Sequence, residues 1–243
     1  MRIAHISDLH LPGKNFVREW GERLLAELAS REPELVVITG DMTDDGYLHE
    51  YEVAHEFIER IEAEKVIVPG NHDARNKGYE VFEELFGTRY PLYRNDMVTV
   101  LGMDSSEPDI DDGHIGRETY GILEERLPED TIKVVALHHH VIPIPGTGRE
   151  RNILIDAGDF LKLCIDRHVH FVLSGHKHLP WMWKLEHTYF ITAGTACSRR
   201  LKGRSYPSFN LLSITESAVS VKEINVTNGA EKEILREKTP FHE

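Results

Sequence analysis

The stretch RIAHISDLH (residues 2–10) joins a short apolar run to a polar turn that begins where the run stops. Residues 2–7 are predicted to form a buried strand, because the run is short, rich in apolar residues and bounded by polar ones. Asp8 and His10 follow at its carboxyl end. An Asp-x-His pair is common in ordinary turns, so it indicates a site only if other strands end in a similar way.

Four further predicted strands do end in this way. They span residues 34–39, 65–69, 132–137 and 169–174, and run into the sequences TGDMTDD, PGNHD, LHHH and SGHKH. The polar side chains that follow them are Asp41, Asn71, His72, Asp73, His138, His139, His140, His176 and His178. Because ligands bind beyond the carboxyl ends of strands in open α/β sheets, the five strand ends together predict one shared site.

The pattern between the strands predicts an α/β fold. Helical spacing of apolar residues is found over 16–30, 47–63 and 157–167, between predicted strands. The C-terminal third instead contains a succession of short strand patterns, which we expect to be antiparallel additions. We expect a single domain over residues 1–226, followed by a polar tail over 227–243.

Composition restricts the classes of partner. The chain carries 41 acidic and 28 basic residues, a formal net charge of −13, which disfavours stable binding of nucleic acid. Its two cysteines do not make a disulfide framework, and no signal peptide or membrane span is apparent. We therefore expect a cytoplasmic protein without a membrane span, and homo-oligomerisation remains open.

Taken together, the blocks D-x-H, G-D, G-N-H-D, H and G-H-x-H resemble those of the calcineurin-like metallophosphoesterase superfamily. The resemblance extends from residue 3 to about residue 215. It is closest to the class III cyclic-nucleotide and glycerophosphodiester phosphodiesterases, in which similar HISDLH and GNHD blocks occur. It implies a four-layer α/β/β/α sandwich, in which two mixed β-sheets are flanked by helices and a two-metal site lies at one edge of the paired sheets.

The resemblance also implies a ligand for each motif position. One metal would be bound by Asp8, His10 and His178, and the other by Asn71, His138 and His176, with Asp41 bridging the two. Imidazole and carboxylate ligands without cysteine suit Fe, Mn, Zn or Co in an open site. His138, the first histidine after its strand, is preferred to His139 as the metal ligand. The positive charge of two divalent ions exceeds the negative charge of the two ligating carboxylates. An acidic chain can therefore still present a cationic pocket to a phosphate ester.

The implied reaction is in-line attack on phosphorus by a metal-bridging hydroxide. His72 would stabilise the transition state or protonate the leaving alkoxide, and Asp73 would orient the His72 ring. We expect a phosphodiesterase of small phosphate esters; a phosphomonoesterase, a nucleotide pyrophosphatase and a non-catalytic scaffold are the alternatives. Hydrolases of nucleotide-diphospho-lipids usually have arginine in place of His72, so GNHD disfavours them.

Two further assignments stay open at the level of sequence. Asp44 is expected to cap the helix predicted over 47–63, the alternative being contact with a metal ligand. Arg199 and Arg200 are expected to face solvent, the alternative being contact with substrate phosphate.

Overall fold

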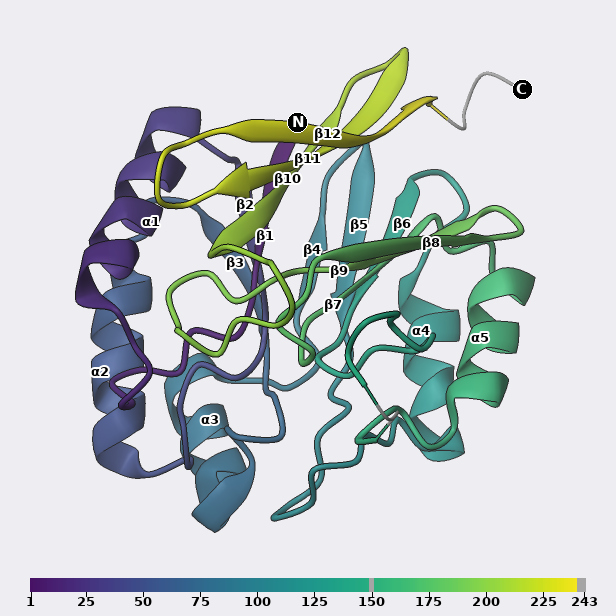
Figure 1. Cartoon of the computed structure of the whole chain (residues 1–243). Helices are drawn as coiled ribbons and strands as arrows, with labels where there is room; N and C mark the ends of the chain where they lie inside the picture. The colour runs from purple at the N-terminus through teal and green to yellow at the C-terminus, as the bar shows by residue number, and fades with distance from the viewer. Residues whose placement is uncertain (149–150, 240–243) are drawn as a thin grey trace.

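The computed structural model describes residues 1–148 and 151–239. Two six-stranded sheets lie face to face, and helices cover the outer face of each (Figure 1). This arrangement confirms the expected four-layer α/β/β/α sandwich of two mixed β-sheets. The described part of the chain contains no helix that is both long and apolar enough to cross a membrane.

The first sheet has the strand order β12-β11-β10-β1-β2-β3. Its strands are β1 (Arg2–Ile6), β2 (Leu35–Thr39), β3 (Glu64–Val68), β10 (Ser208–Ile214), β11 (Ala218–Asn225) and β12 (Glu231–Lys238). β1, β2 and β3 are parallel, and the last three strands are joined to them antiparallel through the β1–β10 pair. The helices on its outer face are α1 (Arg18–Arg31), α2 (Leu48–Glu59) and α3 (Gly78–Phe86).

The second sheet has the order β4-β5-β6-β7-β9-β8. Its strands are β4 (Leu92–Arg94), β5 (Val98–Gly102), β6 (Ile132–Ala136), β7 (Phe171–Ser174), β8 (Trp181–Leu185) and β9 (Thr188–Thr192). Helices α4 (Tyr120–Arg126) and α5 (Ala157–Asp166) cover it. Two short 3₁₀ helices, Arg75–Lys77 and Arg117–Thr119, lie in the connections.

Burial on both faces explains why the central strands are continuously apolar. In β2, Leu35 and Val37 belong to the core between the sheets, whereas Val36 and Ile38 belong to the core beneath the helices. Successive side chains of a strand point to opposite faces, so a strand with two dry faces has no polar alternation. This is the pattern from which the buried strands were predicted.

The five predicted buried strands are confirmed, but they divide between the sheets. β1, β2 and β3 belong to the first sheet, and β6 and β7 to the second. The expectation of antiparallel additions is right for β8, β10 and β11 and right only in part for β9, which pairs antiparallel with β8 but parallel with β7. The reason is the β8–β9 hairpin, in which β8 lies at the sheet edge and β9 returns beside β7.

The segment expected to be a polar tail, 227–243, is not separate from the sheet over its described part. β12 lies within it and pairs with β11 as the edge strand of the first sheet. Most of its side chains are exposed, but Leu235 is buried in the core between the sheets. Charged residues are typical of edge strands, because they discourage pairing with other chains, and this explains the tail-like composition.

The two sheets are in direct contact where β1 and β7 end. The backbone N–H of His176 donates to Asp8 Oδ2 at 3.1 Å, and Gly175 lies at this crossing. A Cβ atom on Gly175 would lie 1.8 Å from Ser7 Oγ and 2.6 Å from Asp8 Oδ2. Only glycine therefore permits the strand ends of the two sheets to approach each other in this way.

Substitution of this glycine should destabilise the protein. Gly175→Ala is expected to lower the free energy of unfolding by about 1–3 kcal/mol, because the added methyl group forces the two strand ends apart. Gly158→Ala is the control, since a Cβ atom added to Gly158 in α5 would have no atom within 4 Å. It should leave stability equal or raise it by up to about 1 kcal/mol. Urea unfolding measures both, and equal stability of the two variants would contradict the prediction.

Candidate metal centre

Seven polar side chains from both sheets converge beyond the carboxyl ends of five strands. β1 is followed by Asp8 and His10, β2 by Asp41, β3 by Asn71, β6 by His138, and β7 by His176 and His178. These are the seven residues that the motifs predicted as ligands, and their side-chain atoms form two neighbouring groups.

The first group contains Asp8, His10, Asp41 and His178. His178 Nε2 lies 3.0 Å from Asp8 Oδ1 and 3.2 Å from His10 Nε2. Oδ2 of Asp41 lies 3.9 Å from His10 Nε2. Two carboxylates and two imidazoles thus direct one atom each into the same small space.

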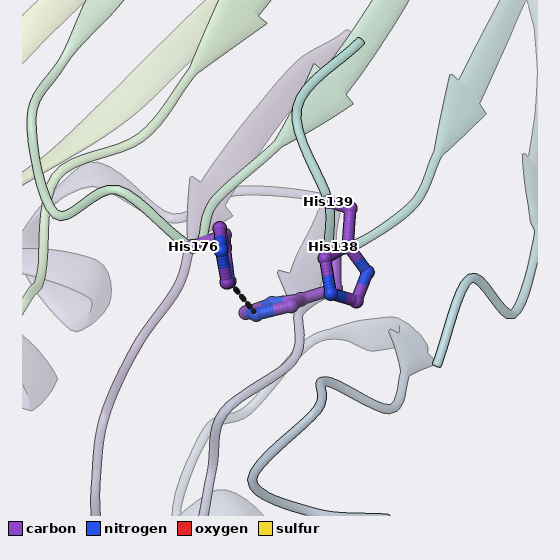
Figure 2. Close-up of side chains that lie close together, drawn as sticks. All are labelled: His138, His139 and His176. Carbon is purple, nitrogen blue, oxygen red and sulfur yellow. Dashed lines mark hydrogen bonds between the residues drawn. The ribbon is translucent and has the colours of Figure 1, made fainter. Parts of the chain in front are cut away.

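The second group contains Asn71, His138 and His176. His138 Nε2 lies 3.1 Å from His176 Nδ1, and Figure 2 shows the two rings joined by this contact. Asn71 Oδ1 lies 3.1 Å from both nitrogen atoms. Oδ1 of Asp41 lies 3.4 Å from His138 Nε2, so the carboxylate of Asp41 directs one oxygen atom toward each group.

The outer ring nitrogens fix the protonation of three histidines. His138 Nδ1 lies 2.7 Å from the carbonyl oxygen of Thr39, and His178 Nδ1 lies 2.7 Å from that of Arg200. A carbonyl oxygen only accepts, so each Nδ1 atom must carry a hydrogen, and in the neutral ring the Nε2 atom then presents a lone pair. His10 Nδ1 lies 3.0 Å from the Asp44 carboxylate, which favours the same tautomer.

The centre of the site therefore contains lone pairs and carboxylate oxygens that face one another. Such groups repel at these distances unless a cation lies among them, and imidazole nitrogens held by outer acceptors are typical metal ligands. The buried carboxylates of the site also change the pKa of a neighbouring histidine. Burial lowers the pKa of His138, but the adjacent Asp41 carboxylate more than offsets this and raises it to about 9. The donor set fits metal ions.

The backbone is strained at most of these positions. Left-handed φ angles are found at five of the seven residues, namely Asp8 (56°), His10 (52°), Asp41 (53°), His176 (71°) and His178 (54°). Each such conformation of a non-glycine residue costs about 1–3 kcal/mol and persists only when the surroundings enforce it, most often at functional sites. Gly40 precedes Asp41 with φ +79°, and a Cβ there would lie 2.5 Å from Gly70 N and 2.8 Å from His138 Nδ1.

Comparisons with known proteins agree with this geometry. The family model described as calcineurin-like phosphoesterase matches residues 1–180. The chain belongs to the calcineurin-like phosphoesterase family. It is 28% identical over 187 residues to a probable cyclic nucleotide phosphodiesterase of Synechococcus sp., with 73% of each chain covered. It is 27% identical over 199 residues to the glycerophosphodiester phosphodiesterase GpdQ of Enterobacter lignolyticus, which covers 73% of this chain and 71% of that protein.

The same fold is found among solved structures of low sequence identity. The purple acid phosphatase PPD1 from yellow lupin seeds superposes with a TM-score of 0.73 at 13% identity, over 96% of this chain and 52% of that one. At this identity the likeness concerns the fold alone. The arrangement of two facing mixed sheets is therefore shared well beyond the relatives detected by sequence.

His139 is close to the site of this calcineurin-like phosphoesterase, but its ring is engaged elsewhere. Its Nδ1 atom lies 2.9 Å from Ser105 Oγ, and its Nε2 atom lies 3.1 Å from the carbonyl oxygen of Asp111. Burial and the neighbouring His138 lower the pKa of His139 to about 3, so the ring stays neutral. Although His139 lies within ligand distance of His138 and His176, its hydrogen bonds favour His138 as the ligand.

The orientation of Asn71 is set by residues that the motifs do not contain. Its Nδ2 atom donates to Asp111 Oδ1 at 3.0 Å, which turns Oδ1 of the amide toward His138 and His176. Asp111 in turn accepts a hydrogen bond from Arg75 Nη2 at 2.6 Å. Asp111 lies in the long connection between β5 and α4, where no strand end or motif marks it in the sequence.

The structure corrects the expected contact between Asp73 and His72. The carboxylate of Asp73 accepts from the backbone N–H groups of Met42 (3.2 Å), Thr43 (2.9 Å) and Gly70 (2.9 Å), and from Thr43 Oγ1 at 2.8 Å. It therefore holds together the two loops that follow β2 and β3. The ring of His72 is oriented instead by the carbonyl oxygen of Asp44, which contacts Nδ1, and Arg75 Nη1 lies 3.0 Å from the same nitrogen.

Asp44 and Arg200 also differ from what was expected. Helix α2 has Tyr47 as its N-cap, so Asp44 does not cap it. Asp44 Oδ1 instead lies 3.0 Å from both His10 Nδ1 and Arg200 Nη2. Arg199 is exposed as expected, whereas Arg200 points inward, with Nη1 3.1 Å from His72 Nε2. The sequence placed both residues near the motifs but could not give the direction of their side chains.

A cavity of about 350 Å³ opens over the side chains predicted as metal ligands. Asp41, Asn71, His176 and His178 lie at its base, and a mostly polar rim surrounds them. The described rim residues are His72, Asp111, Asn152, Lys177, Arg200, Leu201 and Lys202. A small ester can therefore reach the metal ligands from one side of the sandwich.

Metal binding should stabilise the folded protein. At a metal concentration of 100 times Kd, binding adds about 2.7 kcal/mol to the free energy of unfolding, which should raise Tm by roughly 5–10 °C for a chain of this size. Scanning calorimetry of chelator-treated and Mn²⁺- or Zn²⁺-loaded protein measures the shift. His178→Gln should lose most of it, and His49→Gln, at an exposed position on α2, should retain it. A Tm that metal leaves unchanged in the parent protein would contradict the assignment.

Proposed function

We propose that this chain is a metal-dependent phosphodiesterase that binds two metal ions and hydrolyses small phosphodiesters. The observation that carries the proposal is the carboxylate of Asp41, which directs one oxygen toward each of two ligand groups. A carboxylate can be shared by two cations, whereas an imidazole nitrogen serves only one. Two ligand groups that share the carboxylate of Asp41 support two ion positions.

Under the proposal, the ligands divide as the motifs predicted. Asp8, His10 and His178 would hold one ion, Asn71, His138 and His176 would hold the other, and Asp41 would bridge them. The mixed imidazole and oxygen donors suit Fe, Mn, Zn or Co. Bound ions of this kind lower the pKa of water and so supply a nucleophile, and they neutralise charge on the phosphoryl oxygens.

The protein's own residues would position the ester and the departing group. His72 faces the cavity, and its Nδ1–H is directed at the carbonyl oxygen of Asp44. A proton on Nε2 could pass to the leaving alkoxide, and the neutral imidazole that remains would keep its Nδ1 hydrogen bond. Asp73 would act indirectly, by holding the loops that carry Asp41 and His72.

The proposed substrate class rests on the activities for which the relatives are named and on the suitable residues found at all seven ligand positions. Relatives of this chain are named cyclic nucleotide and glycerophosphodiester phosphodiesterases, which favours a diester. The same ligands would also serve a phosphomonoesterase or a nucleotide pyrophosphatase. A non-catalytic scaffold is disfavoured, because all seven ligand positions hold suitable residues.

Several features of the molecule stay predictions. A cytoplasmic location agrees with two free, buried cysteines, Cys164 and Cys197. The acidic composition favours a small substrate over stable nucleic-acid binding. Homo-oligomerisation is also open to experiment.

A metal-reconstituted substrate panel tests the proposal. The protein loaded with Mn²⁺, Fe²⁺, Zn²⁺ or Co²⁺ should hydrolyse bis-p-nitrophenyl phosphate, and faster than p-nitrophenyl phosphate. Cyclic nucleotides, glycerophosphodiesters and nucleotide monoesters then identify the preferred class. A faster rate on the monoester would favour the phosphomonoesterase, and no turnover with any of these metals would exclude the proposed function.

Replacement of His72 tests its role in proton transfer. His72→Ala should retain the metal content of the parent protein and lose about 10²–10⁴-fold in kcat, more for poor leaving groups than for good ones. Elemental analysis and rates on esters of graded leaving-group pKa measure both effects. Release of metal would show that His72 is a ligand, and an equal loss on all esters would show that it does not transfer the proton.

A further inference from the structure

Arg200 occupies a central place at the rim of the cavity. Nη1 lies 3.1 Å from His72 Nε2, and Nη2 lies 3.0 Å from Asp44 Oδ1. Its side chain is 28% exposed, so one side of the guanidinium group faces the cavity while the other contacts protein. The same residue supplies the carbonyl oxygen that fixes the ring of His178.

The loop that carries Arg200 is held firmly against the site. Thr195 Oγ1 donates to the carbonyl oxygen of Asp8 at 2.6 Å, and Val17 N–H donates to that of Cys197 at 2.8 Å. Arg200 N–H donates to Ser198 Oγ at 3.2 Å. Asp44, which pairs with the guanidinium, is packed so closely against Gly13 that a Cβ there would lie 1.7 Å from its Oδ2. Both backbone and side chain of Arg200 are thus positioned by buried contacts.

The guanidinium group has hydrogen-bonding capacity left over. It carries five N–H donors, of which His72 and Asp44 engage one each. Within the described residues, no other acceptor contacts it. The remaining donors form a planar fork at the cavity, and a planar fork matches two oxygen atoms of a phosphate group.

Arg199 provides a natural comparison within the same loop. It has the same side chain one position earlier, but it is exposed, does not line the cavity, and only its backbone N–H makes a hydrogen bond, to Asn15 O at 2.8 Å, in the described structure. The other cations of the rim are less well placed. Lys177 Nζ is directed at the carbonyl oxygen of Arg151, and Lys202 is exposed.

We propose that Arg200 is the residue outside the proposed metal ligands that binds the phosphate group of the ester, with Asp44 holding its guanidinium in position. This inference rests on the proposed function and assigns the recognition of phosphate to one side chain. When Arg200 donates to phosphate oxygens, His72 Nε2 is released from its contact with the guanidinium and faces the ester.

Binding of inorganic phosphate tests the assignment separately from turnover. Isothermal calorimetry on the metal-loaded protein gives the Kd for phosphate, elemental analysis gives the metal content, and bis-p-nitrophenyl phosphate gives KM and kcat. Arg200→Gln should keep the metal content and raise both the Kd for phosphate and KM about tenfold or more. Arg200→Lys, which keeps the charge but loses the fork, should give a smaller increase. Arg199→Gln should stay within twofold of the parent protein.

The outcomes separate this inference from the proposed function. If Arg200→Gln binds phosphate within twofold of the parent protein, or loses its metal, the assignment is wrong. It is also wrong if the parent protein turns over the diester but binds no phosphate. If phosphate binding depends on Arg200 but no ester is hydrolysed, the assignment stands and the proposed function fails.

Discussion

The whole site depends on the convergence of carboxylate oxygens, an amide oxygen and imidazole nitrogens on one small buried space. The carbonyl oxygens of Thr39 and Arg200 hold the Nδ1 hydrogens of His138 and His178, so that in the neutral rings the Nε2 atoms are acceptors. These atoms then face carboxylate and amide oxygens at little more than 3 Å. The arrangement is unfavourable for the polypeptide alone and favourable around cations. The left-handed backbone at five of the seven positions adds to the cost, so the fold as a whole must enforce it.

The sequence correctly predicted that these seven side chains converge, because they lie directly beside strands. A residue that follows a buried strand by one to four positions has its place fixed by the strand, so Asp8, Asp41, Asn71 and His138 could be located from apolar patterns and motifs. The assignment of strands to two sheets came only from the family resemblance. The parallel pairing of β9 and the inclusion of β12 in the sheet depend on which strands become neighbours, and local pattern does not encode this.

The residues around the ligands could not be predicted in the same way. Asp111 and Arg200 reach the site from long connections whose paths depend on tertiary packing. Asp44 fitted the pattern of a helix cap, and only the structure shows that its carboxylate lies between His10 and Arg200. The proposed metal ligands thus lie at strand ends, whereas the groups proposed to contact the ester come from loops. Loops vary more freely than strands, which is consistent with one fold serving many phosphate esters.

The contact between His10 and His178 joins residues 168 positions apart in the chain. Both carboxylates and Asn71 are supplied by the first sheet, and three of the four histidine ligands by the second. During synthesis at about 5–20 residues per second, His138 follows His10 after roughly six to twenty-five seconds, and His178 comes later still. Until His138 is made, the nascent chain has oxygen ligands with a single imidazole, a set that suits hard cations better than zinc or iron. The order of these residues along the chain therefore means that the proposed ligand set is complete only after the strands of the second sheet that precede His178 have been synthesised.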